Sequence, residues 1–338
     1  MSATDNVAVR VIATGGLMLA TLMVTIDMTI ANVALPHMQG SLSGSQEQMT
    51  WVLTSYIVAT AIMTPLSGWL SMKIGRKRLF LISVVSFVAM SVLCGVATSL
   101  PEMVLFRLLQ GFAGASMMPI SQATLLDLWP RRLTAQVMAV WSAVVMAAPI
   151  LGPTLGGFLT EHFSWRWVFY VNVPLGVVGF AGVWFFLPKD EGGSQRPFDV
   201  LGFAALVMFA VGLQLLVDRG HGQDWFESRE IWTYAIVAVC GLYVFVMQTL
   251  TSEHPFFPRE LFRDRNFSSC LVFGVLLSGV LFGSIAMLPV FMQNLMGTAP
   301  CTPAGSAFRA ASARCSPSAS RPGWVSAWGC GGPCWSAR

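Results

Sequence analysis

Residues 52–97 read VLTSYIVATAIMTPLSGWLSMKIGRKRLFLISVVSFVAMSVLCGVA, and this stretch decides the fold class. A helix that rises about 1.5 Å per residue needs roughly 20 apolar residues to cross a bilayer. Apolar runs near 50–70 and 79–99 both meet that length, and a short turn rich in lysine and arginine separates them. The pattern predicts two antiparallel helices that span a membrane.

The composition extends this prediction to the whole chain of 338 residues, of which 55% are apolar and only 11% charged. Soluble domains carry about 25% charged residues. Together with a mean hydropathy of +0.66, this excludes water-soluble, collagen-like, disordered, coiled-coil and nucleic-acid-binding classes. We predict an all-α, polytopic helical membrane protein. Its nine spans are expected near residues 11–34, 50–70, 79–99, 103–126, 136–160, 167–187, 199–217, 232–250 and 268–292.

The distribution of basic residues predicts the orientation. With the N-terminus in the cytoplasm, the outer loops before residue 301 hold only Arg166, Arg219 and Arg229. The inner segments then hold 12 basic residues: Arg10, Lys73, Arg76, Lys77, Arg78, Arg131, Arg132, Lys189, Arg196, Arg259, Arg263 and Arg265. Because cytoplasmic loops carry an excess of lysine and arginine, we expect a cytoplasmic N-terminus and an uncleaved first span.

The last 38 residues, from Cys301, have a different composition. They contain no Leu, Ile, Met, Lys, Asp or Glu, and consist mostly of Ala, Ser, Gly, Pro, Arg, Cys and Trp. We interpret residues 298–338 as an anomalous tail, expected to be read out of frame and to end at a premature stop. A disordered linker is the alternative.

Two full charges lie within predicted spans, Asp27 and Arg107. Each costs about 2.5–3.5 kcal/mol at the bilayer centre, so such groups face a cavity or one another. Both are expected in the outer half of the membrane, where they can pair. We predict a proton or cation-substrate site on Asp27, with Arg107 tuning it and Gln110 beside it as an interhelical hydrogen-bond partner. A structural ion pair, or side chains that snorkel to the interface, is the alternative.

Two further runs combine glycine with charge or with proline. The turn of Gly68, Lys73, Gly75, Arg76, Lys77 and Arg78 is expected to let helices pack and reverse, although topology alone would also explain its basic residues. The fifth span carries Pro149, Gly152, Pro153, Gly156 and Gly157. Prolines remove backbone donors and glycines permit close helix approach, which favours a moving or sealing interface over simple packing.

These motifs together resemble the fourteen-helix drug:proton antiporter branch of the major facilitator superfamily. Residues 68–78 resemble its helix-two/three loop motif, although Met72 stands where the family usually has an acid. The other matching runs are residues 26–36, 107–115, 148–157 and 165–176, with Asp199 and Gly202 opening the seventh span. The resemblance implies an N-terminal six-helix bundle over 1–187, a linker and two additional helices over 188–250, and the first helix of a second bundle over 251–297.

The resemblance also implies a function, which is proton-coupled export of drug-like amphipathic molecules across the inner membrane. Asp27 would be protonated and Arg107 would tune it, while the fifth-span glycines would form a flexible barrier. No cofactor is expected beyond the proton gradient, and a periplasmic adaptor is an expected partner. Because nine of fourteen helices precede the tail, we expect this chain alone not to transport. The alternative is a non-transporting membrane protein that interacts with other subunits. An enzyme is disfavoured because the spans show no pair of nucleophile and base.

Overall fold

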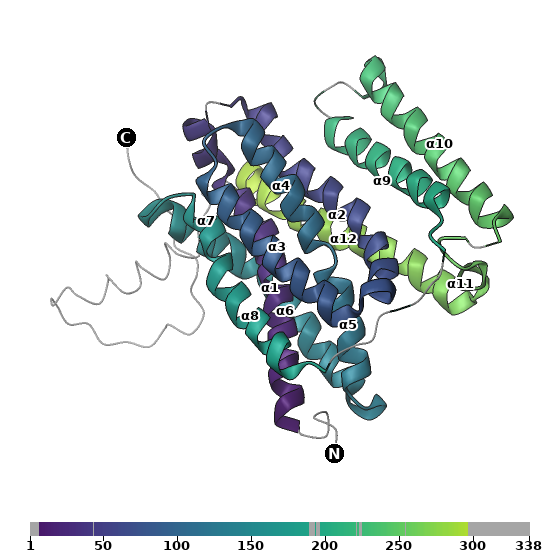
Figure 1. The fold of residues 1–338 in the computed structure, drawn as a ribbon. Helices are drawn as coiled ribbons and strands as arrows, with labels where there is room; N and C mark the ends of the chain where they lie inside the picture. Colours follow the sequence, from purple (N-terminus) through teal and green to yellow (C-terminus); the bar gives the residue numbers. More distant parts are fainter. Residues whose placement is uncertain are drawn as a thin grey trace, which may run out of the picture.

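A computed structural model describes residues 7–296 apart from residues 43, 189–192, 194–196, 221, 223, 224 and 254. The regular structure of these residues is helical (Figure 1). The elements are α1 (Val7–Leu42), α2 (Gln46–Ile74), α3 (Arg76–Val96), α4 (Leu100–Gly114), α5 (Met117–Leu128), α6 (Arg131–His162), α7 (Trp167–Tyr170), α8 (Asn172–Phe186), α9 (Val200–Gly220), η3 (Trp225–Glu227), α10 (Arg229–Thr251), α11 (Arg259–Arg263) and α12 (Arg265–Met296).

Eight helices or consecutive helix pairs in the described residues are long and apolar enough to cross a membrane. They match the first eight predicted spans and confirm the all-α membrane fold. Two of these spans are interrupted: the fourth is divided into α4 and α5, and the sixth into α7 and α8. The ninth predicted span falls on α12, whose side chains are described as far as Val280. The tail 298–338, Lys189 and Arg196 lie outside the described residues.

In the bundle of the first eight helices, α1 contacts α6 and α8, while α2 and α3 both pack against α4. Glycine makes the closest of these approaches possible. A Cβ atom built on Gly16 of α1 would lie 3.1 Å from the carbonyl oxygen of Gly179 and from the Cα of Gly182, both on α8. Since lipid supplies no hydrophobic drive between helices, such close backbone contact is what stabilises their association. It brings the N-terminal third of α1 beside the middle and C-terminal half of α8.

Helices α9 and α10 form a pair that lies beside this bundle (Figure 1). They approach closely at Gly212, where an added Cβ would lie 2.9 Å from the backbone nitrogen of Ala238. The pair contacts the bundle through α2, where the hydroxyl of Thr54 donates to the carboxylate of Asp218. The division of the chain at residues 187, 250 and 297 stays a prediction.

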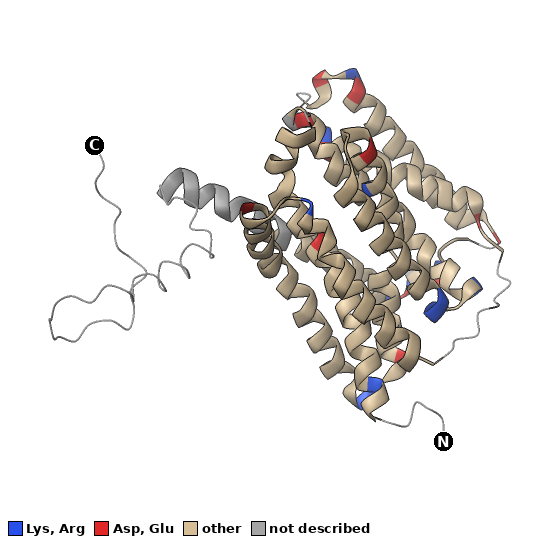
Figure 2. Cartoon of the chain, turned by 60° about the vertical axis from the view of Figure 1, so that its left-hand side comes forward, with Lys and Arg blue, Asp and Glu red and all other residues tan. Residues whose placement is uncertain are grey.

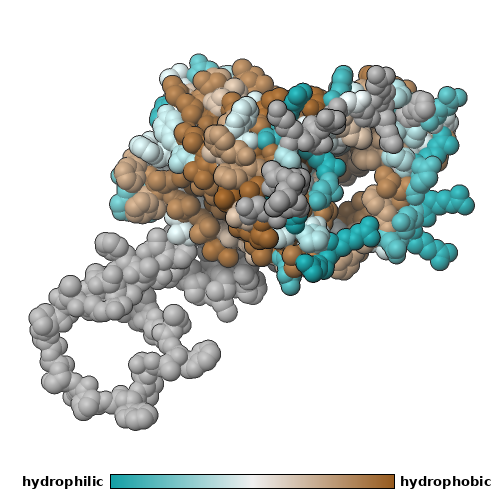
Figure 3. All heavy atoms as spheres, turned by 60° about the horizontal axis from the view of Figure 1, so that its bottom comes forward, coloured by the Kyte–Doolittle hydropathy of each residue, from teal (hydrophilic) through white to brown (hydrophobic). Residues whose placement is uncertain are grey.

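The surface fits a membrane environment. Lysine, arginine, aspartate and glutamate gather mostly toward the ends of the helices, and the long middle stretches are almost free of them (Figure 2). Apolar side chains reach the surface over wide areas (Figure 3). Ile150 is 72% exposed and Phe185 is 74% exposed. Exposed apolar areas of this extent favour contact with lipid rather than water.

Candidate functional site

The centre of the site is the carboxylate of Asp27, which α1 directs into the interior of the bundle, where its side chain is fully buried. Arg107 Nη1 on α4 lies 2.6 Å from Asp27 Oδ2. Gln110, also on α4, donates from Nε2 to Asp27 Oδ1 at 3.1 Å. The structure therefore brings together the three residues that the sequence analysis grouped, and neither charge snorkels to the surface.

A third donor to Asp27 was missed by sequence reasoning. Asn172, the first residue of α8, donates from Nδ2 to Asp27 Oδ1 at 2.7 Å and to Ser91 Oγ at 2.9 Å. Ser91 in turn donates to the carbonyl of Phe169 at 2.9 Å. The available signal was an amide within an apolar run, YVNVPLG at residues 170–176. Within the family resemblance, residues 165–176 form a matching run in which Asn172 has no predicted role of its own.

Aromatic side chains enclose the arginine partner. The guanidinium carbon of Arg107 lies 4.4 Å from the ring centre of Tyr56 on α2 and 5.7 Å from that of Phe169 on α7. Its Nε donates to the carbonyl of Val52 at 3.4 Å. Cation–π contacts of this kind stabilise a desolvated cation without adding a second negative charge. Arg107 is thus held from three sides while Asp27 remains its only carboxylate among the described residues.

The hydrogen bonding of this cluster is incomplete. Arg107 Nη2, Asn172 Oδ1 and the hydroxyl of Tyr56 are buried and have no hydrogen-bond partner within the described part of the chain. A buried polar atom without a partner costs about 1–3 kcal/mol. Such groups in native proteins mark a functional state or a place for water. The cluster therefore has unused hydrogen-bonding capacity directly beside the carboxylate.

The glycines of the fifth span lie against α1 close to Asp27. A Cβ on Gly152 would collide with the side chain of Thr29, and one on Gly156 would lie 3.0 Å from Ile30 Cγ1. Thr29 Oγ1 also donates to the carbonyl of Ala148 at 3.2 Å. Gly157 has no atom within 4 Å of its would-be Cβ. Pro149 is half-buried and Pro153 exposed on the same helix. Two of the three glycines thus form the contact with α1.

The basic turn between α2 and α3 is held by specific contacts. Gly75 joins the two helices at φ 96°, a left-handed conformation that glycine adopts without strain. Arg76 forms an ion pair with Asp127 at the end of α5, and Lys77 Nζ donates to the carbonyl of Trp184 at 2.8 Å. The turn therefore ties α3 to α5 and α8.

Four other positions of this motif serve smaller roles. Lys73 Nζ lies 4.8 Å from the ring centre of Trp69, and Arg78 is exposed. The expectation that Gly68 permits close helix packing is wrong, because its would-be Cβ meets no atom within 4 Å. Met72, which replaces the family's usual acid, is 42% exposed, and its carbonyl accepts from the backbone N–H of Gly193 at 3.2 Å.

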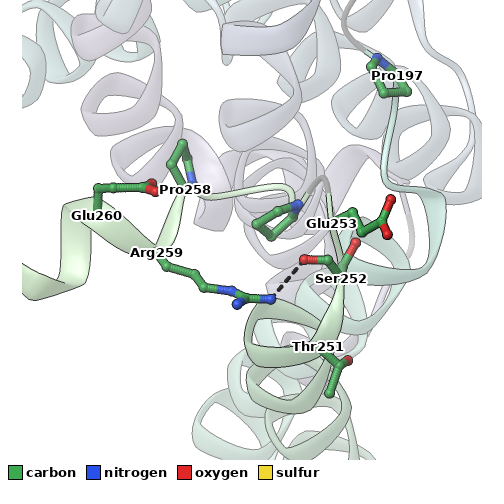
Figure 4. A pocket seen from close by; sticks show the side chains of 8 residues that line it. Pro197, Thr251, Ser252, Glu253, Pro258, Arg259 and Glu260 are labelled. Atoms are coloured by element: carbon green, nitrogen blue, oxygen red, sulfur yellow. Dashed lines mark hydrogen bonds between the residues drawn. The ribbon is translucent and has the colours of Figure 1, made fainter.

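A cavity of about 700 Å³ lies away from this site, between the end of α10 and α11 (Figure 4). Arg259 crosses it and donates from Nη2 to the carbonyl of Ser252 and from Nε to that of Thr249, both at 2.8 Å. These bonds satisfy carbonyls at the C-terminal end of α10. The side chain of Arg259 is thus engaged in ending a helix rather than directed at a ligand.

Comparison with known proteins identifies relatives of this chain by sequence. A sequence model described as Major Facilitator Superfamily matches residues 17–325. The multidrug export protein EmrB of Haemophilus influenzae is 40% identical over 286 residues, which are 84% of this chain and 56% of that protein. The fatty acid resistance protein FarB of Neisseria gonorrhoeae is 38% identical over 280 residues, covering 82% and 55%. The chain spans about half the length of these relatives.

A solved structure supports the fold. The crystal structure of the POT family transporter PepTSo aligns with a TM-score of 0.50 over 70% of this chain and 51% of that one. The two sequences are 11% identical, so this similarity shows the arrangement of helices alone.

Proposed function

The chain belongs to the Major Facilitator Superfamily, and from that premise we propose that it functions in proton-coupled export of drug-like, amphipathic small molecules. Its relatives include proteins named for multidrug export. This chain spans 56% of the length of such a relative. The activity is therefore proposed for a whole transporter in which these residues take part.

The observation that carries the proposal is the fully buried Asp27 carboxylate, held by Arg107, Gln110 and Asn172. With Asp27 ionised, its charge balances that of Arg107. A proton on Asp27 leaves the arginine as an uncompensated buried cation, which is strongly destabilising. Proton binding therefore drives rearrangement of α1 against α4, and release of the proton restores the closed cluster. This is the exchange that an antiporter needs.

The contact between α1 and α6 would transmit that rearrangement. Thr29 and Ile30 follow Asp27 directly on α1 and lie against Gly152 and Gly156. A helix surface without side chains lets another helix slide across it without first moving a side chain aside. We assign the fifth-span glycines to a sliding barrier that responds to the charge of Asp27.

The expected setting follows from the family and from the basic residues. We place the protein in the inner membrane with its N-terminus in the cytoplasm, and assign a periplasmic adaptor protein as a partner. Reporter fusions after Gly75 and after Arg132 test the orientation. Both are expected to report cytoplasm, and a periplasmic signal at either position would contradict it.

The function is tested on the purified chain in lipid nanodiscs. Addition of tetraphenylphosphonium, an amphipathic cation, is expected to displace protons from the parent, measured with a pH dye in weak buffer. Asp27→Asn keeps a similar shape but cannot titrate, so its proton release is expected to vanish. Glu161→Gln, which removes an exposed acid on α6, serves as the matched control and is expected to behave like the parent.

Two outcomes would overturn the proposal. Equal proton release from the parent and Asp27→Asn would make Asp27 a structural residue. A folded parent that releases no protons at any pH would instead favour the non-transporting interaction protein.

A further inference from the structure

Asn172 has a hydrogen-bonding capacity that the closed cluster does not use. Its side chain is fully buried, and Nδ2 donates to both Asp27 Oδ1 and Ser91 Oγ. Its Oδ1 has no hydrogen-bond partner among the described residues. The amide therefore acts only as a donor in this state, with an unused acceptor on the same amide carbon as the donating nitrogen.

The other two partners of Asp27 lack this capacity. A guanidinium has no acceptor atom, so Arg107 can only donate. Gln110 Oε1 already accepts from Arg107 Nη1 at 2.8 Å and from Cys94 Sγ at 3.5 Å. A protonated carboxyl group must donate its O–H to an acceptor, or bury it unpaired. Of the three side chains that donate to Asp27, only Asn172 offers a carbonyl oxygen without a donor.

We propose that Asn172 is a positioning residue that follows the charge of Asp27, donating N–H to the carboxylate and accepting the O–H of the protonated acid after its amide turns over. The inference rests on the proposed function, in which Asp27 gains and loses a proton. In this state Ser91 donates to the carbonyl of Phe169, and its hydroxyl can instead donate to Asn172 Oδ1 once the amide has turned over. Since Asn172 opens α8, the turn of its amide links the charge on α1 to the sixth span.

The charged and titratable side chains around Asp27 are few, which supports Asp27 itself as the source of the response of Asn172. The charged or titratable side chains around the cluster are Arg107, Tyr56 and Cys94. Helix α8 carries none. Tyr170 of α7 packs against Gly95. On α5 and α6 these side chains lie in the terminal turns: Asp127, Arg131, Arg132, Glu161 and His162.

The test is pH-difference infrared spectroscopy of the purified chain, with the Asp27 carboxyl band identified by its loss in Asp27→Asn. Asn172→Leu removes both the donor to the carboxylate and the acceptor for the protonated acid. The band of the protonated acid is expected at higher frequency in this variant, because its O–H has lost its acceptor. A purely structural role would not move that band.

Matched variants distinguish the hydrogen bonding of the Asn172 side chain from the space that it fills. The threonine and valine side chains have the same shape as each other, but only threonine can donate or accept a hydrogen bond. Asn172→Thr is therefore expected to keep the parent band, and Asn172→Val is expected to shift it. This pair also replaces the leucine variant if that chain fails to fold. Asn32→Leu removes an exposed asparagine further along α1 and is expected to leave the band unchanged.

The outcomes distinguish this inference from the proposed function. If Asn172→Leu and Asn172→Val show the parent band unshifted, the role of Asn172 is refuted while proton coupling through Asp27 stands. If the band shifts as expected but tetraphenylphosphonium releases no protons, the role of Asn172 holds and the exporter proposal fails.

Discussion

Two of the four ion pairs that join helices in the described residues lie in opposite surroundings. The side chains of Asp27 and Arg107 are 0% exposed, whereas those of Arg76 and Asp127 are 38% and 68% exposed. An exposed pair contributes about 0–1 kcal/mol because water and salt screen it. Removing one partner of a buried pair costs about 3–5 kcal/mol, because the other charge stays buried. Because it is buried, the pair of Asp27 and Arg107 is sensitive to a single proton. The exposed pair of Arg76 and Asp127 only links two helix ends.

The largest effect is expected from Arg107→Met. The substitution leaves the Asp27 carboxylate buried without its cation and should lower the free energy of unfolding by about 3–5 kcal/mol. The measurement is unfolding in mixed micelles near neutral pH. Adding Asp27→Asn to the same chain removes the unpaired charge and should recover most of the loss. If the double variant were no more stable than Arg107→Met alone, the unpaired Asp27 carboxylate would not be the cause of the lost stability.

A smaller effect on stability is expected at the contact between α1 and α6, next to the buried pair. Gly152→Ala places a methyl group against Thr29 and should cost about 1–3 kcal/mol by overpacking. Gly157→Ala on the same helix meets open space and should change stability by no more than about 0.5 kcal/mol. Thermal unfolding of both variants checks the difference. Equal effects would refute a specific contact at Gly152.

The smallest effect is expected at the exposed pair. Arg76→Gln should cost less than about 1 kcal/mol, and the loss should shrink at high salt because mobile ions screen the pair. A double-mutant cycle with Asp127→Asn, measured at low and high salt, isolates the interaction. A coupling as large as that of Arg107 with Asp27 would remove the contrast between the two regions.

Much of the site could be predicted from sequence because charge and depth are local properties. Asp27 and Arg107 each stand out within an apolar run, and the lengths of the runs place both in the outer half of the membrane. Asn172 could not be singled out in the same way. A neutral amide costs less in lipid than a charge, and its importance comes from partners on α1 and α3 that lie far away in the chain.

The breaks in the fourth and sixth spans were also missed. Average hydropathy over each run is that of one span, although the fourth contains Arg107 and the sixth contains Asn172, so hydropathy gives no reason to divide them. In the structure, Ser116 follows the end of α4 and its hydroxyl lies 2.6 Å from that of Ser83 on α3. Val171 separates α7 from α8 next to the Asp27 cluster. Contacts between helices, rather than the composition of one helix, accompany each break.

The sequence by itself determined the membrane class, the first eight spans and the pair of charges near one depth. These follow from the cost of placing polar groups in lipid, which each segment meets on its own. Only the tertiary structure decided which glycines contact α1, why Gly68 does not pack, and which amide completes the shell around Asp27. Those outcomes depend on the rotation and separation of neighbouring helices, which are set where small residues let backbones meet.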